Sequence, residues 1–274
     1  MGYTELFLRF PDYKTRAVTL SYDDGKSEDR KMVEILNKYG VKCTFNLNAG
    51  KIEGDDNRVQ FEEFAALYEG HEIACHTLTH PHLNNLDVGG IAYQIVKDRE
   101  LLEEKTGKII RGFAYPFGLA ERPGMVDCIG SCGIRYGRTT VSTYGFDLPV
   151  DYLRWHATCH QADPKLPELA KEFFKPDDLE HPWRIRPQLF YIWGHSYEYA
   201  GCWEKLEEMC ALVGGKENVW YATNMEIVDY VSAFRSLQRS VNGKIIHNPT
   251  NVDVFVVADN KNIFIAKGAT VTIE

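Results

Sequence analysis

Two adjacent acids at the end of an apolar run are the residues best placed to do chemistry. Asp23 and Asp24 follow the run Ala-Val-Thr-Leu-Ser-Tyr at residues 17–22 and precede Gly25. A run of this kind predicts a buried strand, and the glycine allows a sharp turn where the acids emerge. Two neighbouring carboxylates are costly unless a cation or a shared proton stabilises them. The alternative is a solvated turn, because Asp-Gly is a common turn signal.

Two histidines four residues apart end a second predicted strand. His76 and His80 follow the segment Gly-His-Glu-Ile-Ala-Cys at residues 70–75. If both strands belong to one β/α barrel, Asp24 and these histidines lie on the same face and can bind a metal. Three protein ligands leave one coordination position open for water, as in catalytic zinc sites. The neighbouring Asp23 could then accept a proton from water that attacks a carbonyl group.

Strand and helix patterns alternate over most of the chain. Strands are predicted at 17–21, 41–46, 71–75, 109–114, 134–138, 153–159, 189–193 and 219–222. Helices are predicted at 27–40, where Ser27 would be the N-cap, and at 60–69, 91–105, 125–132, 166–174, 203–213 and 225–237. This alternation is typical of an α/β protein with a parallel sheet, and about eight units favour a closed or partly closed β/α barrel.

The pattern changes near the C-terminus. Short strands are predicted at 244–247, 252–257, 262–265 and 269–273, and no helical period continues there. We therefore expect two parts, a barrel over residues 1–238 and a small β-strand appendage over residues 239–274.

Composition limits the classes of partner. The 274 residues carry a formal net charge of −8, and 44% of them are hydrophobic. An acidic chain is a poor match for nucleic acid or an anionic membrane, because phosphates require cationic groups. No apolar run is long enough for a membrane span, and the first residues do not resemble a secretion signal. We expect a cytoplasmic protein, and leave open whether it forms a homo-oligomer.

The order and spacing of these motifs resemble the polysaccharide deacetylases, the NodB-like carbohydrate esterases. In that family a strand ending Thr-Phe-Asp-Asp-Gly supplies a catalytic base and then a metal ligand, which corresponds to Ser-Tyr-Asp-Asp-Gly at residues 21–25. Its His-Ser/Thr-x-x-His motif supplies two further ligands. The resemblance implies Asp23 as base, with Asp24, His76 and His80 as ligands, on a distorted or partly open barrel. It covers roughly residues 15–235.

The third motif departs from the family pattern. Where the family has Arg-Pro-Pro-Tyr-Gly, residues 114–118 are Ala-Tyr-Pro-Phe-Gly. The family arginine, which holds the catalytic aspartate, is replaced by Ala114. Arg138 ends the next predicted strand, and we predict that it pairs with Asp23 as the catalytic arginine; a surface arginine is the alternative. Tyr115, Pro116 and Phe117 are candidate substrate-binding residues.

The remaining motifs predict an acid and a binding pocket. Residues 189–195 match the apolar run that leads to the family's catalytic histidine, so His195 is the predicted general acid. Trp193 takes the place of the apolar side chain that lines the acetyl pocket, and His160 is predicted to reach substrate from a neighbouring strand end. The family aspartate that supports the histidine corresponds to either Asp147 or Asp151. Ser196 replaces the aspartate that usually follows the histidine.

These residues predict a metal-dependent hydrolase of a divergent subgroup that removes an acetyl group from an N- or O-acetylated carbohydrate. Zinc is the first candidate for a single divalent ion, and cobalt, nickel, manganese or iron are alternatives. A second hypothesis is hydrolysis of a ureide or cyclic amide at the same site. A third is a carbohydrate-binding protein that has lost catalysis.

Overall fold

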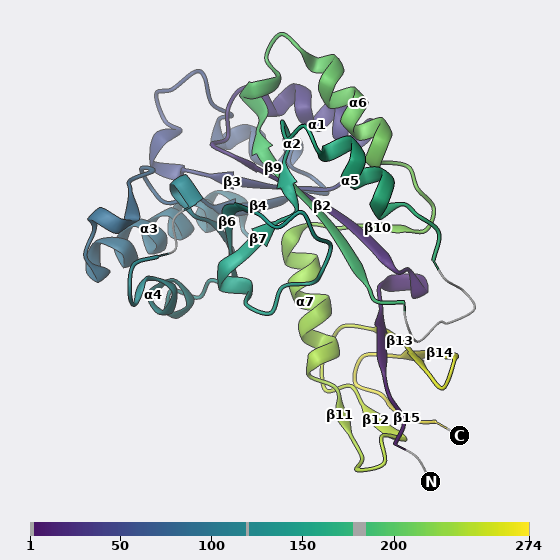
Figure 1. Ribbon diagram of the computed structural model, residues 1–274. Coiled ribbons are helices and arrows are strands. Elements are labelled where there is room, and N and C mark those ends of the chain that lie inside the picture. The colour runs from purple at the N-terminus through teal and green to yellow at the C-terminus, as the bar shows by residue number, and fades with distance from the viewer. Residues whose placement is uncertain (1–2, 119–120, 178–184, 274) are drawn as a thin grey trace.

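A computed structural model describes residues 3–118, 121–177 and 185–273. Figure 1 shows a twisted central sheet with helices around it, and a smaller group of strands that contains the C-terminal end of the chain. None of the helices in these described ranges combines the length and the apolar character needed to cross a bilayer.

The central sheet is parallel throughout. Its strands are β2 (Arg16–Asp23), β3 (Cys43–Leu47), β4 (Glu72–Cys75), β5 (Gly112–Ala114), β6 (Tyr136–Ser142), β7 (Trp155–Ala157), β8 (Cys159–His160), β9 (Gln188–His195) and β10 (Val219–Tyr221). The order is β7-β6-β5-β4-β3-β2-β9-β8, and β10 pairs with the first residues of β2. Each of the eight predicted strands corresponds to part of this sheet.

The two ends of this strand order are neighbours in the sequence. Only Thr158 separates β7 from β8, so one short segment borders β6 at one end and β9 at the other. The Tyr144 N–H donates to the Thr158 carbonyl (3.0 Å), and the Thr158 N–H donates to the Tyr191 carbonyl (2.8 Å). The sheet therefore curves back on itself. The predicted α/β fold, a distorted or partly open barrel, is confirmed, although the predicted strand 153–159 is two short strands.

Strand β2 lies in the middle of the sheet, where both of its faces are covered. All of its residues after Arg16 are buried. Parallel strands covered on both faces need such a continuous run instead of an alternating pattern. Val18, Leu20 and Tyr22 pack in one hydrophobic cluster, whereas Ala17 packs in another with Leu189 of β9.

The helices follow the predicted segments closely. They are α1 (Asp29–Lys38), α2 (Phe64–Leu67), α3 (Val88–Thr106), α4 (Met125–Ser131), α5 (Leu166–Phe173), α6 (Trp203–Val213) and α7 (Asn224–Arg235). Ser27 is not the N-cap of α1, which begins only at Asp29 after Glu28. The reason is that Lys26 forms an isolated strand-like bridge with Arg58, and the Ser27 N–H donates to the Asn57 carbonyl (2.9 Å), which keeps Ser27 outside the helix.

The C-terminal strands form two small antiparallel sheets. One contains β11 (Gln238–Arg239), β12 (Ile245–His247) and β15 (Thr270–Thr272), and the other contains β1 (Phe7–Arg9), β13 (Val254–Ala258) and β14 (Lys261–Ile265). Tyr230 of α7 joins the second sheet to the barrel, since its hydroxyl donates to the Arg9 carbonyl (2.6 Å) and accepts from the Phe255 N–H (3.0 Å). The sequence did not predict β1. The division at residue 238 stays a prediction.

Candidate metal centre and active site

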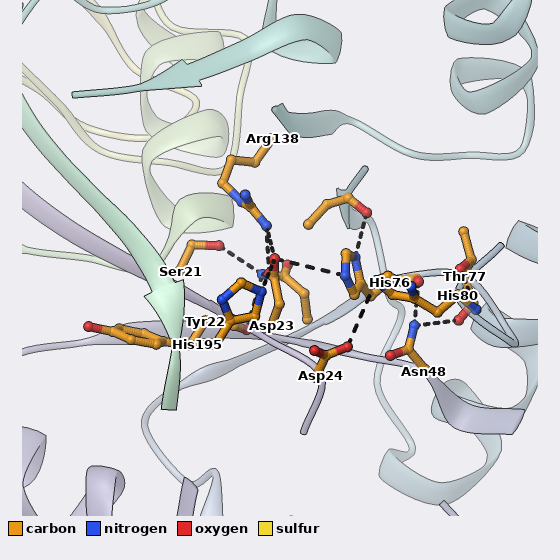
Figure 2. A network of polar contacts seen from close by, with 12 residues as sticks. Ser21, Tyr22, Asp23, Asp24, Asn48, His76, Thr77, His80, Arg138 and His195 are labelled. Carbon is orange, nitrogen blue, oxygen red and sulfur yellow. Dashed lines mark hydrogen bonds and ion pairs between the residues drawn. The ribbon is translucent and has the colours of Figure 1, made fainter. Parts of the chain in front are cut away.

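The candidate residues meet at the carboxyl ends of the central strands. Asp23 is the last residue of β2, and its register partners are Asn46 on β3 and His195 on β9. Parallel strands end at the same edge of a sheet, so these three side chains lie at one level. Figure 2 shows Arg138 and His195 close to Asp23, with His76 and His80 beside Asp24.

Asp24, His76 and His80 form a compact group of possible metal ligands. One donor atom from each lies within 4.8 Å of the others, and His80 Nε2 is 3.9 Å from Asp24 Oδ1. His76 Nδ1 donates to the Ala114 carbonyl (2.8 Å), so its Nε2 keeps a lone pair. Such a bond fixes the tautomer of ligating histidines. Burial lowers the pKa of His76, and it lowers that of His80 to about 4, so both rings are neutral at pH 7 and suit a divalent ion.

The backbone around these ligands is held in uncommon conformations. Asp24 (φ 80°), Thr77 (φ 68°) and His80 (φ 59°) all have positive φ. Hydrogen bonds hold both loops: the Asp24 N–H donates to the Asn46 carbonyl (3.0 Å), and the His80 N–H donates to Thr77 Oγ1 (3.1 Å). Non-glycine residues in this region are strained, and such strain often occurs at functional sites.

Two buried side chains fix the loop that carries His76. Asp98 of α3 is fully buried and accepts from the backbone N–H groups of His76 (3.0 Å) and Ala49 (2.7 Å). The side-chain amide of Asn48 donates to the carbonyls of His76 (2.5 Å) and Thr77 (3.0 Å). The position of the first histidine is therefore set by α3 and by the loop after β3.

Asp23 is buried beside Arg138 of β6. Arg138 Nη2 lies 2.5 Å from Asp23 Oδ1 and also contacts Oδ2, and Asn46 Nδ2 donates to Oδ1 (2.9 Å). Arg138 is the register partner of Ala114, the residue that replaces the family arginine, so the cation comes from the adjacent strand at the same level. The predicted ion pair is present, and its role in catalysis stays a prediction.

The protonation of Asp23 follows from opposing effects. Burial raises the pKa of this carboxyl, but the positive charge of Arg138 and the neighbouring His76 and His195 lower it more, so its pKa lies below the ordinary value. His76 Nε2 and His195 Nε2 lie 3.8 Å and 4.0 Å from Asp23 Oδ2. Asp23 is therefore an ionised carboxylate between the candidate metal ligand His76 and the candidate acid His195.

His195 is supported by a glutamate rather than by either predicted aspartate. Its Nδ1 lies 2.8 Å from Glu198 Oε1, in the short 3-10 helix Ser196–Tyr199 that follows β9. Asp151 instead accepts from the Leu153 N–H (2.9 Å) and pairs with Arg154 (2.9 Å). The prediction that Asp147 or Asp151 supports His195 is therefore wrong, because the carboxylate comes from three residues beyond the histidine.

The predicted substrate-binding residues differ in accessibility. Tyr115 is buried, and its hydroxyl donates to the Leu153 carbonyl (2.7 Å), while Pro116 is also buried. Direct contact of these two side chains with substrate is therefore not supported. Phe117 is 48% exposed, adopts φ 60° and stacks on His82 with ring centres 3.6 Å apart. Its ring also lies 4.7 Å from the ring of His80, at the rim of the candidate metal centre.

Trp193 and His160 lie on the other side of Asp23. The Trp193 ring is nearly buried between the Arg138 guanidinium (4.6 Å) and the His160 ring (4.6 Å). His160 is the last residue of β8 and is the register partner of Trp193. Both residues are therefore near the candidate acid, as the strand ends predict, and their contact with substrate stays a prediction.

Four polar residues around the site escaped the sequence analysis. They are Asn46, Asn48, Asp98 and Glu198, and each holds a candidate residue without belonging to a motif that predicts this. Asn46 lies between Phe45 and Leu47 in a buried strand, a signal that could have been read. Glu198 follows His195 by three residues, so a helical turn after β9 would bring the two together. Asp98 lies on a distant helix and gives no local signal.

The curved parallel sheet, with two histidines and two carboxylates at its carboxyl edge, defines a distorted β/α-barrel protein with a candidate metal site. The family model described as polysaccharide deacetylase matches residues 11–137 of this chain.

Curated relatives and a solved structure are similar to parts of this chain. The chain is 31% identical to the uncharacterized protein YlxY of Bacillus subtilis over 51% of its own length and 42% of that protein. It is also 31% identical to peptidoglycan-N-acetylglucosamine deacetylase of Bacillus cereus, over 39% of its length and 38% of that enzyme. The matches thus span less than half of either relative. The crystal structure of a putative polysaccharide deacetylase from Mycobacterium smegmatis has the same fold, with a TM-score of 0.60 at 18% identity, covering 88% of this chain and 97% of that one.

Proposed function

We propose that this protein is a metal-dependent deacetylase that removes an acetyl group from an N- or O-acetylated carbohydrate. The observation that carries the proposal is the different surroundings of two adjacent carboxylates. Asp24 faces two neutral histidines, whereas Asp23 is held by Arg138 and Asn46. One carboxylate is therefore suited to bind a cation and the other to move a proton.

The donor set fits a single divalent ion. Asp24, His76 and His80 would hold it, and the hydrogen bond from His76 Nδ1 to Ala114 leaves Nε2 available. When bound, such an ion polarises a carbonyl group and lowers the pKa of water. Zinc is the first candidate for two imidazoles and a carboxylate, and cobalt, nickel, manganese and iron accept the same donors.

The protein side chains supply the proton transfers. Asp23 is ionised, and we propose that it accepts a proton from the attacking water. His195 lies 4.0 Å from Asp23, and we propose that its Nε2 donates a proton to the departing amine or alcohol. Arg138 holds the Asp23 carboxylate in place throughout. The exposed pair of Phe117 and His82 offers an apolar face on which a sugar ring could stack.

Acetate release and metal content test this proposal together. Purified protein loaded with zinc should contain about one ion per chain and release acetate from at least one of three probes: N-acetylated chitooligosaccharides, peptidoglycan glycan fragments and acetylated xylan oligomers. Asp23→Asn should lower kcat by about 10²- to 10⁴-fold and keep the metal, the range expected for loss of a general base. The exposed Asp56→Asn variant is the matched control and should behave as wild type.

Two other outcomes would count against the proposal. Opening of a cyclic ureide with no acetate release would favour the ring-opening hypothesis at the same site. Glycan binding without metal and without turnover would favour a protein that only binds carbohydrate.

A further inference from the structure

A second cluster of possible ligands lies beside the first. His160, His195 and Glu198 bring three donor atoms within 4.8 Å of one another. Glu198 Oε1 lies 2.8 Å from His195 Nδ1, and Glu198 Oε2 lies 3.5 Å from His160 Nε2. One carboxylate therefore faces both histidines, and the cluster could be either a second metal site or a hydrogen-bonded network.

The tautomer of His160 favours a hydrogen-bonded network over a second metal site. The backbone N–H of Ala162 donates to His160 Nδ1 (3.2 Å), and a backbone N–H can only donate. Nδ1 must therefore be unprotonated, which places the ring proton of His160 on Nε2, the atom that faces Glu198. A protonated nitrogen cannot bind a metal. The opposite holds for His76, whose Nδ1 donates to a carbonyl and whose Nε2 is open.

We propose that Glu198 is the positioning residue for His195, the part that the sequence predicted for Asp147 or Asp151, and that His160 and Gln161 hold it there. This inference rests on the proposed function, because it assigns Glu198 a part in the work of the general acid. With its Nδ1 proton bound to Glu198, His195 turns Nε2 toward Asp23 and the metal centre.

The position of Glu198 is itself determined by neighbouring residues. Gln161 Nε2 donates to Glu198 Oε2 (2.7 Å) and to the His195 carbonyl (3.0 Å), which joins the end of β8 to the end of β9. Gly194 makes room for this side chain, since a Cβ there would lie 2.4 Å from Gln161 Cδ. A larger residue at position 194 would therefore displace the Gln161 side chain that holds Glu198.

The charges around His195 agree with this role. Burial lowers the pKa of His195, but the Glu198 hydrogen bond and the charges of Asp23 and Asp24 raise it more, so its pKa lies above the ordinary value. Hydrogen bonds from His160, His195 and Gln161 hold the pKa of Glu198 far below its usual range, despite partial burial. Arg138 is the nearby cation, and it is paired with Asp23. Glu198 therefore stabilises the protonated form that an acid needs.

NMR titration of the His195 ring in the zinc-loaded protein tests the inference without any substrate. His195→Asn identifies the resonance. Glu198→Gln should lower the pKa of His195 by about 1 unit, the smaller end of the effect of a neighbouring opposite charge. The exposed Glu208→Gln variant changes the same charge on α6 and should leave the titration unchanged.

Kinetics and metal content complete the test. Glu198→Gln should lower kcat at pH 7 by about tenfold with little change in KM, shift the alkaline limb of the kcat profile to lower pH, and keep one metal ion per chain. Glu198→Asp should retain part of the activity. An unchanged His195 titration in Glu198→Gln would overturn the proposal, as would two ions per wild-type chain and one in Glu198→Ala. Absence of acetate release from every glycan would instead refute the proposed function.

Discussion

Replacing Arg138 by methionine measures what the buried ion pair contributes to stability. Arg138 is fully buried and Asp23 is 3% exposed, and Arg138 Nη2 donates a hydrogen bond to the Asp23 carboxylate. Methionine keeps much of the side-chain volume but removes the charge. The variant therefore leaves Asp23 in a buried site without its cation.

Two separate estimates give the expected loss of stability in Arg138→Met. Removing one partner of a buried ion pair costs about 3–5 kcal/mol. Asp23 could instead take up a proton in the folded variant, and at pH 7 protonating a carboxyl with an unfolded pKa of about 3.9 costs about 4 kcal/mol. We therefore expect the free energy of unfolding to fall by about 4 kcal/mol at pH 7.

The loss should depend on pH with a definite sign. In the wild type the pKa of Asp23 is lowered, so its contribution to stability is present above the unfolded pKa and is lost as the pH falls through the folded value. In the variant, protonation of Asp23 becomes easier toward pH 4. The difference between the two proteins should therefore shrink as the pH is lowered from 7 toward 4.

Urea denaturation of reduced, metal-chelated protein at several pH values is the suitable assay. Arg154→Met is the matched control, because Arg154 pairs with Asp151 at 2.9 Å but both side chains are about half exposed (53% and 47%). Exposed pairs contribute about 0–1 kcal/mol. A loss below about 1 kcal/mol in Arg138→Met, or one that does not shrink toward pH 4, would refute the reasoning. Adding Ala114→Arg to the variant should recover part of the stability.

Three further predictions concern pH, substrate and metal. Burial raises the pKa of Asp29 from 3.8 to about 7 although Tyr68 donates to it, so the contribution of Asp29 to stability should fall by up to about 4 kcal/mol as the pH rises from about 4 to about 7; in urea titrations the stability of Asp29→Asn should fall less steeply than that of the wild type over this range. Phe117→Ala should raise KM for oligosaccharides about 2- to 10-fold, with kcat nearly unchanged, because it removes one stacking face beside His82; an unchanged KM would exclude the stacking role. Removing the metal with a chelator should lower Tm, and free zinc at 100 times its Kd should raise the free energy of unfolding by about 2.7 kcal/mol. A Tm that does not depend on zinc would count against a native metal site.

The grouping of the candidate metal ligands could be predicted from sequence because their signals are local. Asp24 follows directly on an apolar strand, and His76 and His80 are four residues apart at the end of another. Arg138 was predicted because the expected strand 134–138 ends there; β6 continues to Ser142, but Arg138 still lies at the level of Ala114, the last residue of β5. In each case the spacing along the chain determines the position in space.

Other features depend on contacts that the sequence does not encode locally. Tyr115 and Phe117 are two residues apart and look equivalent, but the positive φ of Phe117 turns its ring outward while Tyr115 stays buried. Asp98 reaches His76 only because α3 packs against β4. The support of His195 was predicted at Asp147 or Asp151, before the predicted strand 153–159, whereas it lies one helical turn after His195, at Glu198.

The pairing of β1 with β13 determines how the protein can be divided. Removing residues 239–274 would delete β13 and leave residues 7–9 without their strand partner, and Tyr230 would lose one of its two backbone contacts. The unpaired segment lies only six residues before β2, whose far end carries Asp23 and Asp24. A shortened protein made for crystallography or enzymology therefore needs both strands, or neither.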